Sequence, residues 1–326
     1  MIPDVSDSTG ALTQSSVSDD IAAVRGAVTS FIRGKDDVVD LALCCLLASG
    51  HLLLEDVPGT GKTSLARALS RSLSLTWNRI QFTPDVMPSD VTGVTVYHQS
   101  SEAFEFHPGP VFASILLADE INRATPRTQA ALLEAMEERT VTVDTRTHEL
   151  PEPFLVIATQ NPVESAGTYP LPEAQLDRFL MRTSMGYPDH GAEVAVVSAH
   201  HHGHRVNDVE PAIDYKATLR LIKAAESVHV DAAVLDYVVR LVEATRDAPG
   251  IVLGASPRGS IALLRASRAW ALLQGRDFVV PGDVQHLAPS VLAHRLVLSV
   301  DARAKGDSAS NTVTSLIESI HSPQGG

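Results

Sequence analysis

The chain has 326 residues, of which 44% are hydrophobic and 20% are charged, as expected for an ordinary globular protein of about two domains. Its formal net charge is -13, and it contains no block of basic residues. Proteins bind duplex nucleic acid mainly by neutralising phosphates with Lys and Arg, so this balance weighs against a nucleic-acid partner without excluding a local basic patch.

The N-terminal segment, residues 1–18, is small and polar and is expected to be a flexible tail. It lacks the basic and then apolar pattern of a signal peptide, and no stretch approaches the roughly 20 apolar residues that span a membrane. Cys44 and Cys45 are adjacent, and neighbours do not easily close an unstrained disulfide, so we interpret them as small core residues. We therefore expect a cytoplasmic protein without a membrane span.

Residues 19–187 alternate helical and strand patterns. Apolar residues at helical spacing predict two helices, and short apolar runs without alternation are typical of strands buried on both faces of a parallel sheet. The alternation predicts an α/β domain, with a parallel sheet and helices on both faces. The predicted helices are 19–32, 36–48, 62–75 and 128–139; the strands are 52–54, 79–82, 115–118 and 154–158; a hairpin is expected at 140–150.

A Gly-rich turn joins the first strand to a helix that begins at Lys62. Glycines let backbone N–H groups cradle phosphates, and a helix N-terminus favours anions. The pattern predicts that Lys62 reaches the β- and γ-phosphates of ATP and that Thr63 holds Mg²⁺. Asp56 replaces the usual first glycine, and its effect on phosphate binding is left open. The predicted nucleotide-binding residues are Pro58, Gly59, Thr60, Gly61, Lys62, Thr63 and Asp119.

Polar residues end two of the other strands, at the edge where α/β sheets place ligands. Asp119 is predicted to bind Mg²⁺, directly or through water, and Glu120 to act as the general base on the attacking water. Such an acidic pair could alone be a helix N-cap, but its place after the Gly-rich turn strengthens the catalytic interpretation. Asn161 is predicted to contact the γ-phosphate or the attacking water, and the alternative is an ordinary Asn-Pro turn.

From residue 188 to 322 helical patterns dominate, which predicts a separate, mostly helical domain. Its candidate helices are 219–226, 231–246, 258–273, 281–293 and 308–321. Near the boundary, His200, His201, His202 and His204 have spacings that do not place a full ligand set on one helical face. We interpret them as part of a solvated linker rather than a metal site.

Together these elements resemble the AAA+ ATPases, and the segments between them closely resemble one branch, the MoxR family. The resemblance covers nearly everything from about residue 20 to 298. It implies an AAA+ P-loop core followed by a helical lid domain, and self-association into a ring that we expect to be a hexamer. The matching stretches are residues 81–85, 88–90, 106–110, 117–126, 132–138, 158–162, 167–179, 254–258 and 292–295.

The resemblance also implies roles for two arginines. Arg178 matches the arginine finger, which in a ring would point into the neighbouring subunit's ATP. Arg258 matches the second sensor, which we expect to touch the phosphates of the same subunit's nucleotide from the lid. The alternatives are salt bridges: Arg178 with Asp177 or Glu173, and Arg258 with a carboxylate near its helix start. The predicted catalytic residues are therefore Glu120, Asn161, Arg178 and Arg258.

Two insertions of the family, which commonly face the pore or the substrate, are matched by residues 83–109 and 141–150. We therefore predict an ATP- and Mg²⁺-dependent motor that remodels or matures a partner protein complex, and the resemblance implies a client with a von Willebrand factor A domain. An insertase for a metal cofactor, similar to the magnesium chelatase motor, shares these insertions and stays open. A nucleic-acid motor is opposed by the acidic balance. Glu137 is interpreted as part of a solvated helix face.

Overall fold

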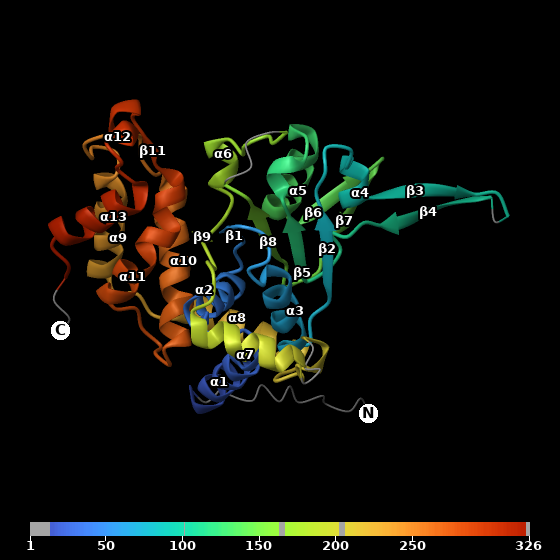
Figure 1. Cartoon of the computed structure of the whole chain (residues 1–326), viewed down its shortest axis with the longest axis horizontal. Helices are drawn as coiled ribbons and strands as arrows, with labels where there is room; N and C mark the ends of the chain where they lie inside the picture. The colour runs from blue at the N-terminus through green and yellow to red at the C-terminus, as the bar shows by residue number, and fades with distance from the viewer. Residues whose placement is uncertain (1–13, 101, 163–166, 202–205, 324–326) are drawn as a thin grey trace, which may run out of the picture.

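The structure, a computed structural model, describes residues 14–100, 102–162, 167–201 and 206–323 (Figure 1). Its first helix, α1 (Gln14–Phe31), begins inside the predicted tail, so that prediction is wrong for residues 14–18; residues 1–13 lie outside the described residues. Val17 and Ile21 are buried one helical turn apart, and this apolar stripe extends the helix toward the N-terminus.

The central sheet is parallel and has the strand order β2-β5-β8-β1-β9, which confirms the predicted α/β core. Leu52 of the first strand lies opposite Ile157 on one side and opposite Met181 on the other. The last strand is only three residues long, too short for the sequence pattern to predict. The strands are β1 (Leu52–Glu55), β2 (Trp77–Gln81), β5 (Ile115–Asp119), β8 (Leu155–Gln160) and β9 (Met181–Thr183).

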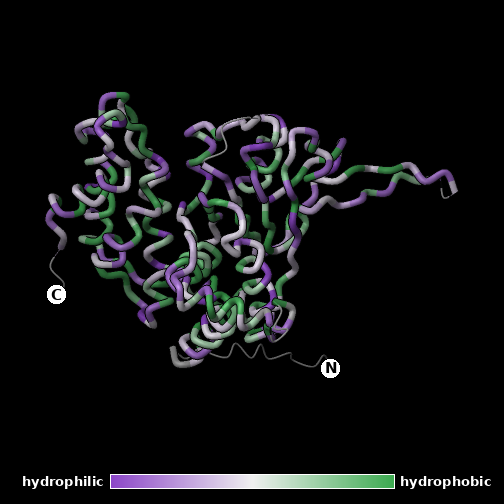
Figure 2. Tube along the Cα trace, in the orientation of Figure 1, coloured by the Kyte–Doolittle hydropathy of each residue, from purple (hydrophilic) through white to green (hydrophobic). Residues whose placement is uncertain are grey.

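Both faces of the sheet are buried, which explains the continuous apolar runs (Figure 2). Leu52 and Leu54 face one hydrophobic cluster, which also contains residues of three helices and of the C-terminal half. Leu53 faces the other cluster with residues of the helix after β5. The core helices besides α1 are α2 (Asp36–Leu47), α3 (Lys62–Ser72) and α5 (Pro126–Glu138), with the short η1 (Ile121–Arg123) and α6 (Glu173–Leu176).

The C-terminal half is mostly helical, and its later helices stand to one side of the core (Figure 1). Its first part is tied to the core, because the N–H groups of Ala212 and Ile213 donate to the carbonyl of Ser72 at 2.9 and 3.2 Å. Among the described residues, no helix combines the length and apolar character needed to cross a membrane. The elements are α7 (His190–His201), η2 (Val206–Asp208), α8 (Tyr215–Ser227), α9 (Ala232–Ala244), β10 (Ile251–Leu253), α10 (Pro257–Leu273), α11 (Pro281–Leu292), η3 (Ala293–Arg295), β11 (Val297–Leu298), α12 (Val300–Ala304) and α13 (Ala309–Ser319).

The expected linker contains helix α7. His200 and His201 are its last two residues, so this part of the linker is helical. Most of the described side chains of α7 are exposed, so the segment is solvated as expected but helical. His202 and His204 lie outside the described residues.

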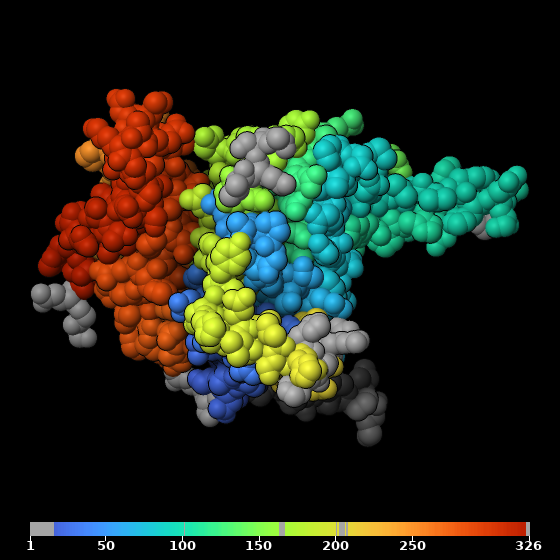
Figure 3. Space-filling model, viewed as in Figure 1, coloured from blue at the N-terminus to red at the C-terminus, as the bar shows by residue number. Residues whose placement is uncertain are grey.

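Two antiparallel hairpins leave the core. One confirms the predicted hairpin and consists of β6 (Thr140–Val143) and β7 (Arg146–Glu149). The other follows α4 (Pro88–Thr92), consists of β3 (Gly93–His98) and β4 (Ala103–Pro108), and projects far from the core (Figures 1 and 3). It starts at a close crossing, since a Cβ on Gly93 would lie 2.3 Å from the carbonyl oxygen of His107, and the φ of Gly93 is +97°.

Candidate functional site

The Gly-rich loop between β1 and α3 forms the floor of a cavity of about 380 Å³. Gly59 and Gly61 have φ angles of +85° and +95°, which residues with a Cβ rarely adopt, so glycine is required at both positions. The predicted nucleotide-binding residues and the predicted Glu120 and Asn161 all line this one cavity. It is lined by Asp56, Pro58, Gly59, Thr60, Gly61, Lys62, Thr63, Ser64, Arg79, Gln81, Asp119, Glu120, Thr159, Gln160 and Asn161.

The cavity fits a magnesium nucleotide. Nothing lies within 4 Å of a Cβ built on Gly59, so the loop presents an open surface to a ligand. The N-terminus of α3, at Lys62, opens on the same cavity and favours phosphate. Thr63 and Asp119 both line it and supply the hydroxyl and carboxylate oxygens that Mg²⁺ prefers.

Lys62 keeps its ammonium group over the loop. Its Nζ donates to the carbonyl oxygen of Val57 at 2.7 Å and to that of Asp56 at 3.3 Å. These acceptors are neutral, and a phosphate oxygen would accept a stronger, charge-assisted bond from the same group. The side chain is therefore positioned to exchange loop carbonyls for phosphate.

Asp56, in the position of the usual first glycine, turns its carboxylate toward the chain that follows β9. Its Oδ2 accepts from the N–H of Met185 at 2.6 Å and from the N–H of Gly186 at 2.8 Å, while Oδ1 accepts from Val57 at 3.0 Å. Asp56 is buried, and these backbone N–H groups stabilise the charge of its carboxylate. The side chain therefore ties the nucleotide loop to the segment that leads into α7. Because this partner is distant in sequence, no local pattern could have indicated it.

The two carboxylates after β5 are held by a residue that the sequence did not single out. The hydroxyl of Thr159 donates to Oδ1 of Asp119 at 2.6 Å and accepts from the N–H of Glu120 at 2.9 Å. Oδ2 of Asp119 also lies 2.7 Å from Arg79, and Glu120 lies 2.9 Å from Arg123. Thr159 thus links the carboxylate of Asp119 to the backbone of Glu120.

Glu120 has the backbone conformation of a strained site residue, with a φ of +55° in the left-handed region. A residue with a Cβ adopts this region at an energetic cost, which the surrounding hydrogen bonds offset. Asn161 follows the neighbouring strand, and its carbonyl accepts from Asn122 at 3.5 Å. The structure therefore brings Asn161 and Glu120 to the same end of the sheet, as predicted.

Arg178 and Arg258 lie elsewhere, on a separate cavity of about 360 Å³. Both bind Glu137 of α5: Arg178 at 3.0 Å and Arg258 at 2.8 Å. In this structure the docked lid places Arg258 against Glu137, which agrees with the alternative of a carboxylate partner, and Arg258 does not line the P-loop cavity. Glu137 is exposed, as expected, but it binds both arginines and is more than part of a solvated face. The partner of Arg178 is also neither Asp177 nor Glu173.

This second cavity, hereafter the arginine cavity, is rich in positive charge. Its lining has more arginines than carboxylates, so it is suited to bind an anion. The arginines are Arg139, Arg178, Arg258, Arg265 and Arg295, and the carboxylates are Glu137 and Asp177.

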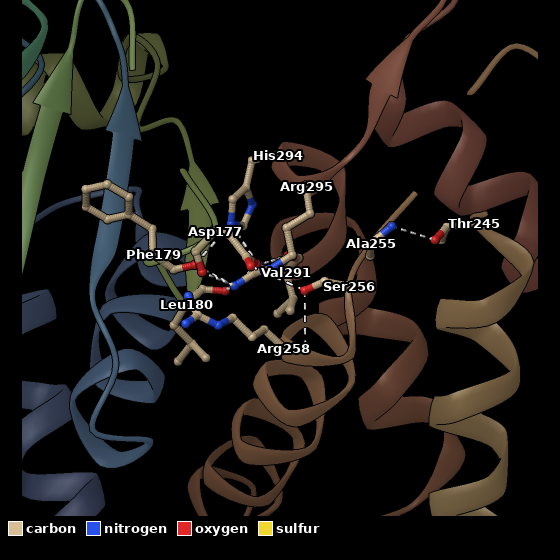
Figure 4. Close-up of polar contacts among 10 residues, drawn as sticks. All are labelled: Asp177, Phe179, Leu180, Thr245, Ala255, Ser256, Arg258, Val291, His294 and Arg295. Atoms are coloured by element: carbon tan, nitrogen blue, oxygen red, sulfur yellow. Dashed lines mark hydrogen bonds and ion pairs between the residues drawn. The ribbon is translucent and has the colours of Figure 1, made fainter. Parts of the chain in front are cut away.

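A buried arginine joins the lid to the core beside this cavity (Figure 4). The side chain of Arg295 is 3% exposed; its Nε lies 2.7 Å from Oδ1 of Asp177, and its Nη2 donates to the carbonyl of Phe179 at 2.7 Å. Burial lowers the pKa of Arg295, and the Asp177 carboxylate opposes that shift. His294 lies 3.1 Å from the same Phe179 carbonyl. The only sequence signal for this contact is the family-like stretch 292–295.

The comparisons with known proteins agree with this geometry. A family model described as the ATPase family associated with various cellular activities (AAA) matches residues 51–181, and one described as the AAA lid domain matches residues 243–318. Protein YeaC of Bacillus subtilis is 50% identical to this chain, over 89% of the chain and 91% of YeaC.

Two further relatives and a solved structure give the same result. Chaperone MoxR1 of Mycobacterium tuberculosis is 43% identical over 91% of this chain and 81% of its own length. Protein MoxR of Methylorubrum extorquens is 34% identical over 86% of this chain and 88% of its own length. A solved structure from Cytophaga hutchinsonii, described as a candidate ATPase, superposes with a TM-score of 0.90 at 36% identity. It covers 95% of this chain and 97% of that one.

Proposed function

The chain belongs to the MoxR family of AAA+ ATPases, and from that premise we propose that it hydrolyses ATP as a ring and uses this reaction to remodel a partner protein. The observation that carries the proposal is the cavity at the carboxyl ends of β1, β5 and β8. There the phosphate-binding loop, a carboxylate pair and Asn161 meet.

The residues of this cavity divide the work. The loop N–H groups and Lys62 bind the phosphates, and Lys62 leaves the carbonyl of Val57 to do so. Thr63 and Asp119 hold Mg²⁺, which when bound neutralises charge on the phosphates. Glu120 accepts the proton of the attacking water, and its backbone N–H donates a hydrogen bond to the hydroxyl of Thr159. Asn161 orients that water.

The arginine cavity supports a ring, because one subunit's P-loop cavity does not include Arg178 or Arg258. Charge that develops on the γ-phosphoryl group needs such donors, and a neighbour can bring them. We propose that both arginines act on the adjacent subunit's nucleotide, leaving Glu137 as they do so. A head-to-tail interface of this kind closes into a ring when the rotation permits, and we propose six subunits.

The test is the mass in solution and the ATPase rate, with and without ATP, for the wild type, Glu120→Gln and Arg178→Ala. We expect an ATP-dependent ring. Glu120→Gln should assemble and bind ATP, and its turnover should fall by at least about a hundredfold. A monomer that hydrolyses ATP at the same rate with and without Arg178 would overturn the ring.

We propose that the client is a protein with a von Willebrand factor A domain and that the action is chaperone-like. Support for the chaperone-like action comes from the relative named Chaperone MoxR1, and the two hairpins that leave the core offer surfaces for a client. The von Willebrand factor A domain of the client rests on the family resemblance. The test is stimulation of the ATPase by candidate client proteins and by DNA. Stimulation by DNA and by none of the proteins would contradict the proposal.

A further inference from the structure

The projecting hairpin brings together three side chains with metal-ligand chemistry. His98 lies on β3 and Glu105 and His107 on β4, and one ligand atom of each lies within 4.8 Å of the other two. Glu105 pairs with Val96, and His107 pairs with Val94. Side chains alternate between faces along a strand, so all three ligands lie on the same face of the hairpin. None of them lines the nucleotide cavity or the arginine cavity.

One nitrogen of His98 faces the other two ligand atoms at once. Nε2 of His98 lies 3.1 Å from Oε2 of Glu105 and 3.4 Å from Nε2 of His107. A neutral imidazole nitrogen is either a donor or an acceptor. As a donor, His98 would share one proton between two acceptors; as an acceptor from His107, it would turn a lone pair toward the carboxylate. A cation between the three atoms satisfies all of them.

We propose that His98, Glu105 and His107 bind a divalent transition metal of the Zn²⁺ class. Tetrahedral zinc with ligand bonds of about 2.0–2.1 Å holds neighbouring ligand atoms about 3.3 Å apart, and the two measured separations are 3.1 and 3.4 Å. Two imidazoles and a carboxylate suit zinc and leave its fourth position open. The side chains of His98 and Glu105 are 38% and 66% exposed, so an ion can enter directly from solvent.

The metal would stiffen a part of the molecule that little else supports. The base of the hairpin is anchored by Phe106, whose ring stacks on His148 at 4.0 Å and meets Phe112 edge-on at 5.5 Å. Beyond that anchor the ribbon stands free on the face shown in Figure 3, and an isolated two-stranded ribbon is marginally stable. An ion that links β3 to β4 adds its binding free energy to the folded hairpin.

The opposite face of the hairpin gives this rigidity a use. Tyr97 and Phe104 pair across the strands, with ring centroids 5.1 Å apart, and are 50% and 73% exposed. A hairpin held by a metal on one face presents this aromatic pair in one fixed orientation on the other.

The test is a calorimetric titration of the metal-free full chain with Zn²⁺ in buffer without nucleotide, so its result does not depend on the ATPase. Because His200, His201, His202 and His204 could bind Zn²⁺ by themselves, all four are replaced by Ala in every sample. The site variants are His98→Ala, His107→Ala and the conservative Glu105→Gln. The control is His321→Ala, an exposed histidine far along the chain. Circular dichroism checks that each variant is folded.

We expect one equivalent of Zn²⁺ to bind, with at least about tenfold weaker affinity in each site variant and unchanged affinity in His321→Ala. Zn²⁺ should also slow amide hydrogen exchange over residues 94–107, and it should not do so in His98→Ala. The proposal is overturned if no Zn²⁺ binds to the protein in which the four histidines at residues 200–204 are replaced. It is also overturned if His98→Ala binds Zn²⁺ as tightly as His321→Ala.

Discussion

The nucleotide cavity and the arginine cavity are built in different ways. The first is made of short stretches that each end a strand: the loop after β1, the carboxylates after β5 and the polar residues after β8. The second collects arginines from the residues just after α5 and α6, from α10 and from η3, which are far apart in sequence. The first cavity has the parts needed to hold a nucleotide within one subunit. The second has cations but no phosphate-binding loop, so in the ring that we propose each subunit would contribute one half to each of two different sites.

The strongest test of this division mixes inactive variants. Arg178→Ala should bind ATP yet lose about a thousandfold in turnover, because the developing charge loses its donor. Mixed in equal amounts with Lys62→Ala, it should recover roughly a quarter of the wild-type rate, since one random interface in four then has both halves intact. The measurement is the ATPase rate of the mixed rings against each variant alone.

The same assay decides on which side Arg258 acts. If it acts with Arg178 on the neighbour's nucleotide, Arg258→Ala should be rescued by Lys62→Ala but not by Arg178→Ala. Rescue of Arg258→Ala by Arg178→Ala would place Arg258 with its own subunit's P-loop and break the comparison.

Replacing Lys62, the cation of the phosphate-binding loop, should weaken ATP binding in the first cavity and leave the arginine cavity unchanged. Lys62→Ala should lose roughly tenfold to a hundredfold or more in ATP affinity, the worth of a hydrogen bond to a charged group. Titration with a fluorescent ATP analogue measures this, with Lys216→Ala, an exposed lysine of α8, as the control. Equal affinities in the two variants would contradict the role of Lys62.

Asp56 lines the nucleotide cavity, but we expect it to contribute to stability and not to ATP binding. Asp56→Gly should lower the free energy of unfolding by about 1–3 kcal/mol, since the N–H groups of Met185 and Gly186 lose their acceptor. ATP affinity should change by less than about threefold, because the carboxylate is already hydrogen-bonded to the N–H groups of Val57, Met185 and Gly186. Thermal denaturation and ATP titration measure the two effects, with Asp56→Asn as the variant that keeps an acceptor. A large loss of affinity with unchanged stability would reverse this assignment.

A buried histidine at the arginine cavity should make the stability of the protein depend on pH. His51 lines it, accepts from the N–H of Val156 and bonds the carbonyl of Met136; burial, and then Arg139, lower its pKa to about 3. The unfolded chain, with a His pKa of about 6.5, binds more protons between these values. The free energy of unfolding should therefore be highest above about pH 6.5 and fall as the pH is lowered toward 3. A shift of this size corresponds to a loss on the order of a few kcal/mol.

Calorimetric melting temperatures at pH 7.5 and pH 4.5 check this prediction for wild type and His51→Gln. Acidification should destabilise the variant less than the wild type. His294 contributes in the same direction, because burial and then Arg295 lower its pKa well below the ordinary value. An identical pH dependence in both proteins would show that His51 is not a source of it.

Local patterns predicted the parts of the molecule whose partners are near in sequence. The apolar strand runs, the loop from Pro58 to Thr63 and the acidic pair after β5 each carry their own signal, and the structure brings them together. The clamp of Asp56 on Met185 and the shared partner of Arg178 and Arg258 depend on how distant segments dock. The projecting hairpin was expected only as an insertion, since its strands are held by a crossing at Gly93 and by cross-strand pairs that no single strand reveals.

The buried Arg295 also bears on how force passes through an assembly. Swinging the lid away from Asp177 would break this ion pair and the hydrogen bond from Arg295 to the Phe179 carbonyl, and losing both contacts opposes the movement. This contact favours movement of the lid and the core together, and Arg178 directly follows Asp177, the core residue of the ion pair. In the ring that we propose, relative movement would then be concentrated between subunits, where the arginines of one would meet the nucleotide of the next.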